Sequence, residues 1–144
     1  MPADQSAGMW FSYAFAIVDH MNDAYEHVTN VCNVHAVHMP TMDEQYVRDC
    51  MWSFLESADA AQEDCYALCD PRPSMERAMH HAAAAARRVA PYRSRPHARV
   101  AAWLQHAADI ASRGIAVLDG TMTADDYSAW LHADTGRLSV LART

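Results

Sequence analysis

The sequence predicts an all-α protein, with four helices in an antiparallel up-down-up-down bundle and a short fifth helix at the C-terminus. Three observations favour this fold class. Breaks that contain proline or glycine divide the chain into long stretches without turn signals, apolar residues in those stretches recur at steps of three and four, and no stretch alternates with the period of a strand. The chain has the length of one domain, so we expect residues 1–144 to form a single bundle.

Four breaks separate the expected helices. They span residues 39–41 (MPT), 70–74 (DPRPS), 90–96 (APYRSRP) and 118–120 (LDG). Gly120 suits a helix end, because glycine tolerates the left-handed conformation that is common there. Side chains that suit helix starts stand beside three of the breaks: Thr41 with Glu44, Ser74, and Thr123 with Asp126. The stretches between the breaks are therefore expected to be helices joined by short connections.

The first expected helix carries one inward stripe. Its members, spaced alternately four and three residues apart, are Met21, Tyr25, Val28, Cys32, His35 and Met39. We expect this face to point into the bundle, where it would bury one thiol and one imidazole. A buried imidazole needs hydrogen bonds or a metal ion, so His35 is the member of the stripe that points to a function.

The second expected helix permits two registers. In the first, the inward stripe is Val47, Cys50, Phe54, Ala61 and Leu68. In the second, which is shifted by one residue, it is Met51, Ala58 and Cys65. The choice decides whether Cys50 or Cys65 faces inward, and the sequence leaves it open.

The third and fourth expected helices each carry a single stripe. The stripes are Met75, Met79, Ala82, Ala86 and Val89 in the third helix, and Val100, Trp103, Ala107, Ile110, Gly114 and Val117 in the fourth. The short fifth helix is expected from Ala124 to about His132, across one end of the bundle. Three histidines fall outside the stripes and are expected to be solvated: His20, His27 and His106. A surface metal site of His20, His80 and His106 is a weaker alternative, because the three lie near one level of the bundle.

Charge and composition argue against several classes of protein. The formal net charge of −7 makes nucleic acid and anionic membrane surfaces poor partners. The apolar run GMWFSYAFAIV follows Asp4 rather than a basic segment, so we expect no signal peptide, and no stretch is apolar for long enough to cross a bilayer. The expected location is the cytoplasm, where the four cysteines stay thiols. No Glu-x-x-His pair, phosphate loop or dinucleotide fingerprint indicates an enzyme, so catalysis stays undecided.

An antiparallel bundle would gather donor side chains at the end where the first helix stops and the second begins, here called the first pole. They are Cys32, His35, His38, Met39, Met42, Cys50, Tyr92 and His97. Thiolate and thioether ligands favour Cu(I). We therefore expect one or a few Cu(I) ions at this pole, with these ligands: Cys32, His35 and Cys50, and Met39 or Met42 as a further donor. Zinc bound by cysteine and histidine stays open.

Ordinary core packing is the competing interpretation, because cysteine and methionine are common core fillers. At the opposite pole, core packing is the favoured interpretation for the cysteines and methionines, which are Cys65, Cys69, Met75 and Met79. There a Cys-x3-Cys pair has no evident third ligand. At the first pole the imidazole of His35 makes the two interpretations about equal.

The spacing of these residues resembles the cysteine-rich four-helix-bundle copper storage proteins over about residues 20–118. In that family the inward stripes carry cysteines at steps of three and four, which bind many Cu(I) ions. In the segment RDCMWSFLESADAA, Cys50 matches a cysteine, whereas Ser57 and Ala61 stand where further cysteines are expected; the segment HARVAAWLQHAADIASRGIAVL keeps the leading histidine but has no thiol. The resemblance implies copper entry at the pole that holds His35, His38, Met39, Met42 and His97. With four cysteines, it implies one or a few ions rather than bulk storage.

Two further functions remain open. Polar groups inside the bundle are typical of an enzyme or binding protein with a small-molecule pocket between the helices, lined by Tyr25, His35, Cys50, Ser57 and Trp103. The alanine-rich segment HHAAAAARRVA could instead offer a flat surface to another subunit, as in a homo-oligomer or a scaffolding module. The expected partner is thus a metal ion, a small molecule or a second copy of the chain.

Overall fold

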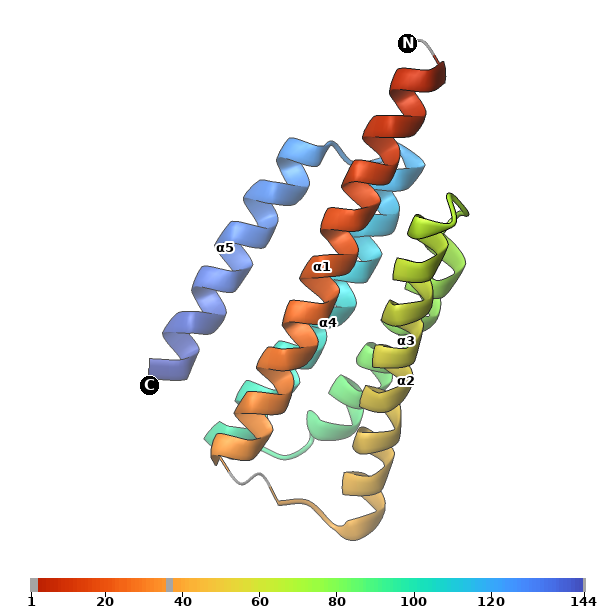
Figure 1. The fold of residues 1–144 in the computed structure, drawn as a ribbon. Helices are drawn as coiled ribbons and strands as arrows, with labels where there is room; N and C mark the ends of the chain where they lie inside the picture. The colour runs from red at the N-terminus through yellow and green to blue at the C-terminus, as the bar shows by residue number, and fades with distance from the viewer. Residues whose placement is uncertain (1–2, 36–37, 144) are drawn as a thin grey trace.

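The computed structural model describes residues 3–35 and 38–143, with side chains for residues 8–32 and 38–141. Figure 1 shows five helices within these ranges and no strand, which confirms the all-α prediction. The helices are α1 (Ala3–His35), α2 (Thr41–Tyr66), α3 (Arg72–Val89), α4 (Arg95–Asp119) and α5 (Ala124–Arg143). Helices α1 to α4 pack as a bundle, and the first pole gathers the end of α1, the start of α2, the end of α3 and the start of α4.

Helix α4 is central, because it packs against α1, α3 and α5. At its contact with α1, a β-carbon added to Gly114 would lie 2.3 Å from Cγ2 of Ile17 and 3.0 Å from Cε of Met75. Real atoms do not approach this closely, so only glycine permits this spacing of the two helices. The largest side chains around this contact are buried: Ile17, Met21, Met75 and Ile110.

Helix α2 uses both registers that the sequence allows. Its buried residues include Val47, Cys50 and Phe54 from the first register, and Ala58 and Cys65 from the second. Leu68 was expected on the inward stripe, but it lies beyond the helix in the left-handed conformation and is 71% exposed. Cys50 and Cys65 are both buried because α1 and α3 cover a face of α2 that is wider than a single stripe.

The helix ends confirm part of the capping prediction. Gly120 ends α4 with a φ of 79°, and the hydroxyl of Thr123 accepts a hydrogen bond from the backbone N–H of Asp126 at 3.1 Å. The capping box at Thr41 is wrong, because Pro40 precedes α2 and no side chain caps that helix. Ser74 also does not cap α3; its hydroxyl donates to Asp64 of α2 at 3.0 Å.

The prediction of a short fifth helix across one end is wrong. Helix α5 has 20 residues and lies alongside α1 and α4 (Figure 1). Tyr127 and Leu138 are buried, with 4% and 0% of their surface exposed, so the helix has its own inward face from end to end. The helix continues past His132 through Asp134 and Gly136, two residues with low helix propensity.

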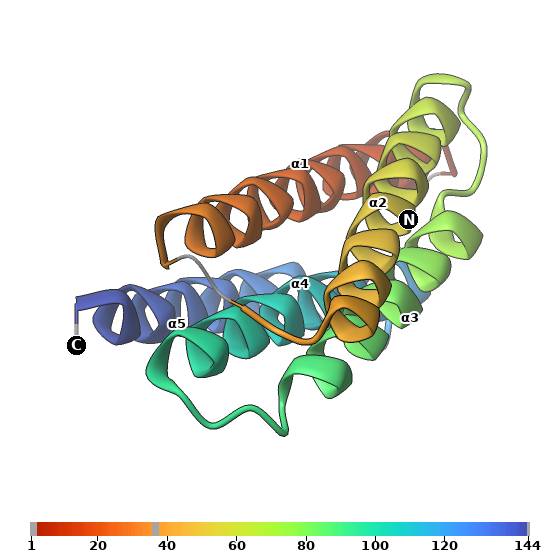
Figure 2. The same ribbon diagram turned by 90° about the horizontal axis from the view of Figure 1, so that it is seen from below.

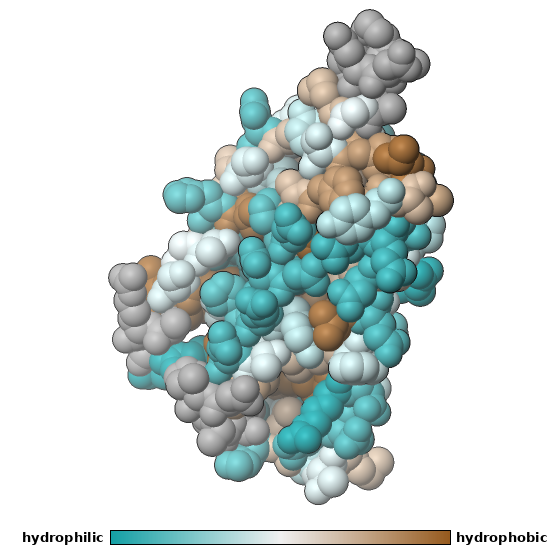
Figure 3. Space-filling view, viewed as in Figure 1, coloured by the Kyte–Doolittle hydropathy of each residue, from teal (hydrophilic) through white to brown (hydrophobic). Residues whose placement is uncertain are grey.

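The surface shown in Figure 3 is largely hydrophilic over the middle of the bundle, with apolar area toward the end where α2 stops. Large apolar side chains that are exposed on α1 or near this end of α2 are Met9, Tyr13, Tyr66 and Leu68. Among the described residues, none of the helices has both the length and the apolar character needed to cross a bilayer.

Candidate functional site

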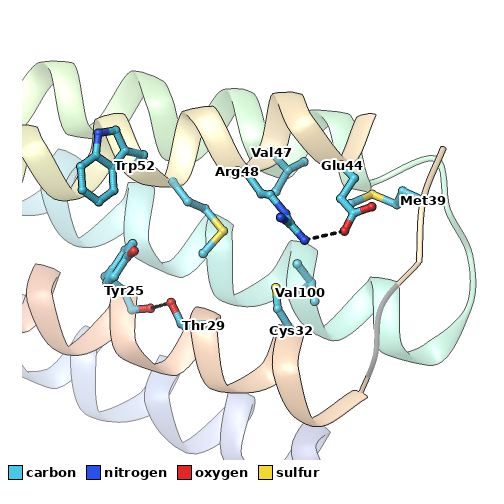
Figure 4. A pocket seen from close by; sticks show the side chains of 10 residues that line it. Tyr25, Thr29, Cys32, Met39, Glu44, Val47, Arg48, Trp52 and Val100 are labelled. Atoms are coloured by element: carbon cyan, nitrogen blue, oxygen red, sulfur yellow. Dashed lines mark hydrogen bonds and ion pairs between the residues drawn. The ribbon is translucent and has the colours of Figure 1, made fainter. Parts of the chain in front are cut away.

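A groove of about 470 Å³ lies between α1 and α2 near the first pole. Seen from below, the end of α1 lies apart from the start of α2 (Figure 2). Side chains from both helices, from the connection between them and from α4 line the space (Figure 4): Tyr25, Thr29, Cys32, Met39, Glu44, Val47, Arg48, Met51, Trp52 and Val100. The divergence of α1 and α2 therefore leaves an opening that reaches the buried surface of α4.

The floor of the groove is apolar and its rim is polar. Val47 and Val100 are buried below it, and Met51 is half-buried. At the rim, a guanidinium nitrogen of Arg48 lies 2.9 Å from a carboxylate oxygen of Glu44. The two side chains are 70% and 38% exposed, so this ion pair is weak and can exchange partners at little cost.

Three sulfur-bearing side chains also line the groove: Cys32, Met39 and Met51. Burial raises the pKa of the Cys32 thiol, and the nearby positive charge of Arg48 only partly offsets this effect. Cys32 is therefore a neutral thiol at physiological pH. A metal ion that bound here as a thiolate complex would have to displace this proton.

The structure separates the metal ligands expected at the first pole. Cys32 and Met39 reach the groove, but Cys50 is buried in the core and does not line it, and Met42 is 84% exposed. His38 is exposed, and its backbone carbonyl accepts a hydrogen bond from Nε2 of His97 at 2.8 Å. The side chain of His35 lies outside the described residues. Within the described ranges, no three side chains from histidine, cysteine, aspartate or glutamate meet in a way that could hold a metal.

The two remaining donors of the first pole are engaged with each other. The ring of Tyr92 stacks on that of His97 with centroids 5.0 Å apart, and its hydroxyl donates to Asp43. Asp43 also receives a hydrogen bond from Arg88 at 2.9 Å. These side chains form a polar cluster between α2, α3 and the start of α4, and none of them lines the groove.

The residues expected around a small-molecule pocket are divided in the same way. Tyr25 lines the groove, whereas Trp103 lines a second, smaller pocket between α1, α4 and α5. Ser57 and Cys50 are each 8% exposed and line neither space. The fold therefore does not bring the described members of this set into one pocket, because Tyr25 and Trp103 face opposite sides of the bundle interior.

The second pocket contains two histidines whose burial the sequence patterns missed. His106, expected to be solvated, is 3% exposed, and His20 is half-buried; both line this pocket of about 130 Å³. His80 does not join them, since its side chain is 69% exposed and faces Glu76, so the surface site of His20, His80 and His106 is wrong. His27 is exposed, as expected.

At the opposite pole the thiols do not form a pair. Cys65 is fully buried and Cys69 is exposed, and burial raises the pKa of Cys65 to about 11. Met75 is also fully buried in the core. Core packing, the favoured interpretation for this pole, accounts for Cys65 and Met75.

The alanine-rich segment of α3 is buried along one face. Ala82, Ala85 and Ala86 are buried in the bundle, whereas Ala83 and Ala84 are half-buried. The buried alanines pack within the bundle, and a surface for a second subunit on this segment stays a prediction.

Comparisons of the chain with protein-family models, with curated proteins and with solved structures find no match. The resemblance to the copper storage proteins therefore rests on residue spacing alone.

Proposed function

We propose that the protein binds a small, mostly apolar organic molecule in the groove between α1 and α2. The observation that carries this proposal is the groove's volume of about 470 Å³, which falls within the range of small-molecule sites. The proposal takes α1 to α4 as an antiparallel up-down-up-down bundle. The gathering of alternate helix starts and ends at the first pole supports that topology (Figure 1).

The lining indicates what kind of molecule fits. Val47, Met51 and Val100 would bury an apolar body, and Trp52, which is 59% exposed, offers a flat aromatic wall at the rim. Arg48 could turn from Glu44 to a negatively charged end of the ligand, because an exposed ion pair is worth little. An elongated molecule with one anionic end matches these features best.

A dye of this shape tests the proposal. The probe is 8-anilinonaphthalene-1-sulfonate, an apolar ring system with one sulfonate, whose fluorescence rises when it enters an apolar site. Thr29→Phe would place a ring in the groove from α1 and should weaken binding of the dye at least about tenfold, equal to a binding loss of about 1.4 kcal/mol. Ala16→Phe, at an exposed position on the same helix, should leave binding unchanged. Equal binding by the two variants would place the dye elsewhere and overturn the proposal.

Binding of Cu(I) in the same groove is the second candidate function. Its support is the presence of Cys32, Met39 and Met51 around one opening, because sulfur donors favour Cu(I) over harder metals. Met51 would here replace Cys50, which was the ligand expected from the sequence. Since the raised pKa of Cys32 keeps it protonated, the affinity for Cu(I) should increase with pH.

A competitive titration separates the two candidates. Reduced, metal-free protein is titrated with Cu(I) against a chelator, with Zn(II) in parallel. Cys32→Ala and Met51→Leu should each weaken binding of Cu(I), whereas Cys69→Ala, at an exposed thiol outside the groove, should not. If the protein fails to compete with the chelator for Cu(I) while it still binds the dye, the proposal of an organic ligand is kept and the proposal of copper binding is rejected.

A further inference from the structure

The smaller pocket lies on the face of α1 that is turned away from the groove. The groove is lined by Tyr25, Thr29 and Cys32 of this helix, and the pocket by His20, Asp23, Ala24 and His27. At 100° per residue these two sets fall on opposite faces. The pocket is closed by α4 and α5, which lie beside α1 on this side of the molecule (Figure 1).

A buried histidine–carboxylate pair forms one wall of this pocket. Nδ1 of His106 lies 2.6 Å from Oδ2 of Asp134, and the two side chains are 3% and 15% exposed. Nε of Arg137 donates to the other carboxylate oxygen of Asp134 at 3.0 Å. The imidazole is thus held in one orientation by Asp134, which is itself held by Arg137 one turn further along α5.

The charges of this pair fix which ring nitrogen carries the proton. Burial lowers the pKa of His106 more than the hydrogen bond to Asp134 raises it, so the imidazole is neutral at physiological pH. Burial alone would raise the pKa of Asp134, but the hydrogen bonds from His106 and Arg137 outweigh it and keep the carboxyl ionised. A carboxylate accepts and cannot donate, so Nδ1 must donate to Asp134 and Nε2 is left as an acceptor.

Nε2 of His106 is open to the pocket. It has no hydrogen-bond partner among the described residues, yet within those residues no side-chain nitrogen or oxygen is both fully buried and unpaired. Nε2 must therefore reach solvent, and the pocket that His106 lines is the space beside it. A hydrogen-bond acceptor in a fixed orientation thus faces the pocket.

Most of the other walls are aromatic or aliphatic, and the polar residues Asp23 and Thr135 line the rest. The ring of His27 stacks on Trp103 with centroids 4.7 Å apart, and Trp103 meets the ring of His106 edge-on at 5.5 Å. Ile110 and Leu131 complete the apolar lining. The volume of about 130 Å³ suits a single ring, because an apolar cavity of roughly 150 Å³ accommodates benzene.

His20 stands at the edge of the pocket and is also fixed. Its Nδ1 lies 2.9 Å from the hydroxyl of Tyr127, and the two rings are stacked with centroids 5.8 Å apart. Tyr127 is 4% exposed, so α5 orients this imidazole as it orients His106. Two imidazoles of the pocket are therefore positioned by side chains of α5, which is more than core packing requires.

We propose that this pocket binds a neutral molecule made of one aromatic or heteroaromatic ring with a single O–H or N–H donor, such as a phenol or an azole, which donates to Nε2 of His106. The site is separate from the groove between α1 and α2, and the proposal does not depend on what the groove binds. Its ligand needs a donor because the pocket presents an acceptor, and a neutral molecule fits better than an anion because the carboxylate of Asp23 also lines the pocket and would repel a negative charge.

Phenol and toluene provide the first test, since they have the same ring and differ in the donor. Binding is followed in the intact protein through the NMR signals of the indole N–H groups of Trp103, which lines the pocket, and Trp130, whose ring centroid lies 5.7 Å from that of His106. Phenol should bind about three- to tenfold more tightly than toluene, which is the effect of one net hydrogen bond. Equal binding of the two compounds, or binding of neither, overturns the proposal without any variant being needed.

Two variants test the role of His106 itself. Asp134→Asn replaces the acceptor at Nδ1 with an amide that can donate to it, so the proton moves to Nε2 and the preference for phenol over toluene should disappear. His106→Phe keeps the ring but has no acceptor, and it should also bind the two compounds equally. Helicity and toluene binding show that each variant is folded. A preference for phenol that survives in both folded variants would assign the hydrogen bond to another group and overturn the proposal.

Discussion

The two sides of α1 differ in how closely the neighbouring helices approach. On the side of α4, Gly114 lets Ile17 pack directly against the backbone, and α5 closes the histidine pocket with paired polar groups. On the side of α2, the facing side chains include Met51 and Trp52, and the helices diverge around the groove. The separation of two packed helices depends on the side chains at their contact. Small residues and matched polar pairs thus accompany the close interface of α1 with α4 and α5. Large apolar residues accompany the open interface of α1 with α2.

The largest expected effect lies on the closed side. Asp134→Ala should lower the free energy of unfolding by about 2–3 kcal/mol, because it leaves the nearly buried imidazole of His106 without a partner. Glu44→Ala on the open side is the matched control and should cost about 0.3–0.5 kcal/mol or less, since its partner Arg48 is exposed. Urea denaturation followed by circular dichroism measures both. Similar losses in the two variants would remove the distinction between the sides.

Two glycine substitutions test the close approach of α1 and α4. Gly114→Ala should destabilise the protein by about 1–2 kcal/mol, because the new methyl group collides with Ile17. Gly136→Ala in α5 meets no atom within 4 Å and should stabilise the protein by about 0.5–1 kcal/mol through helix propensity. The same thermal or urea melts check both. A gain in stability from Gly114→Ala would mean that the helices are less tightly packed than described.

The histidines of the closed side should make stability depend on pH. Burial lowers the pKa values of both His20 and His106 in the folded protein, so the unfolded chain binds protons more readily. Stability contributed by the neutral imidazoles is therefore present above the unfolded pKa of about 6.5 and is lost as the pH falls below it, by at most about 1.4 kcal/mol per pH unit for each histidine. Urea midpoints between pH 7.5 and 5 should decline less in His106→Gln than in the wild type. An identical decline would exclude His106 as a source.

The smallest expected effect is on the open side. Thr29→Phe should change the free energy of unfolding by less than about 1 kcal/mol, because the ring enters the existing groove instead of a filled core. The comparison with Gly114→Ala is direct, since the latter adds only one carbon and should still cost more. If Thr29→Phe proves the more destabilising of the two, the groove is closed in solution.

The fold class followed from the sequence because burial in a bundle repeats with the helix period. Met21, Val28, Val100 and Ile110 were placed inside by spacing alone, and all four are buried. The same reasoning could not choose a register for α2, because that helix buries residues from two adjacent stripes. Spacing identifies a narrow inward face well, and a broad one only in part.

The candidate sites were less accessible to sequence reasoning. The pairing of His106 with Asp134 depends on the length of α5, which polar residues after His132 concealed. A usable signal was present: Tyr127, Leu131, Asp134 and Leu138 recur at helical spacing, which places Asp134 on the inward face. No pattern in the sequence indicates the groove, because the divergence of two helices depends on packing across the whole bundle and not on any local pattern.

Helix α1 lines both spaces, and this gives the two sites a common mechanical element. Tyr25, Thr29 and Cys32 face one site, while His20 and His27, on intervening turns of the same helix, face the other. A ligand that shifts α1 from one side alters the free energy of binding on the other. Thermodynamic linkage then requires reciprocity: the factor by which a groove ligand changes the affinity of the histidine pocket must equal the factor by which a pocket ligand changes the affinity of the groove.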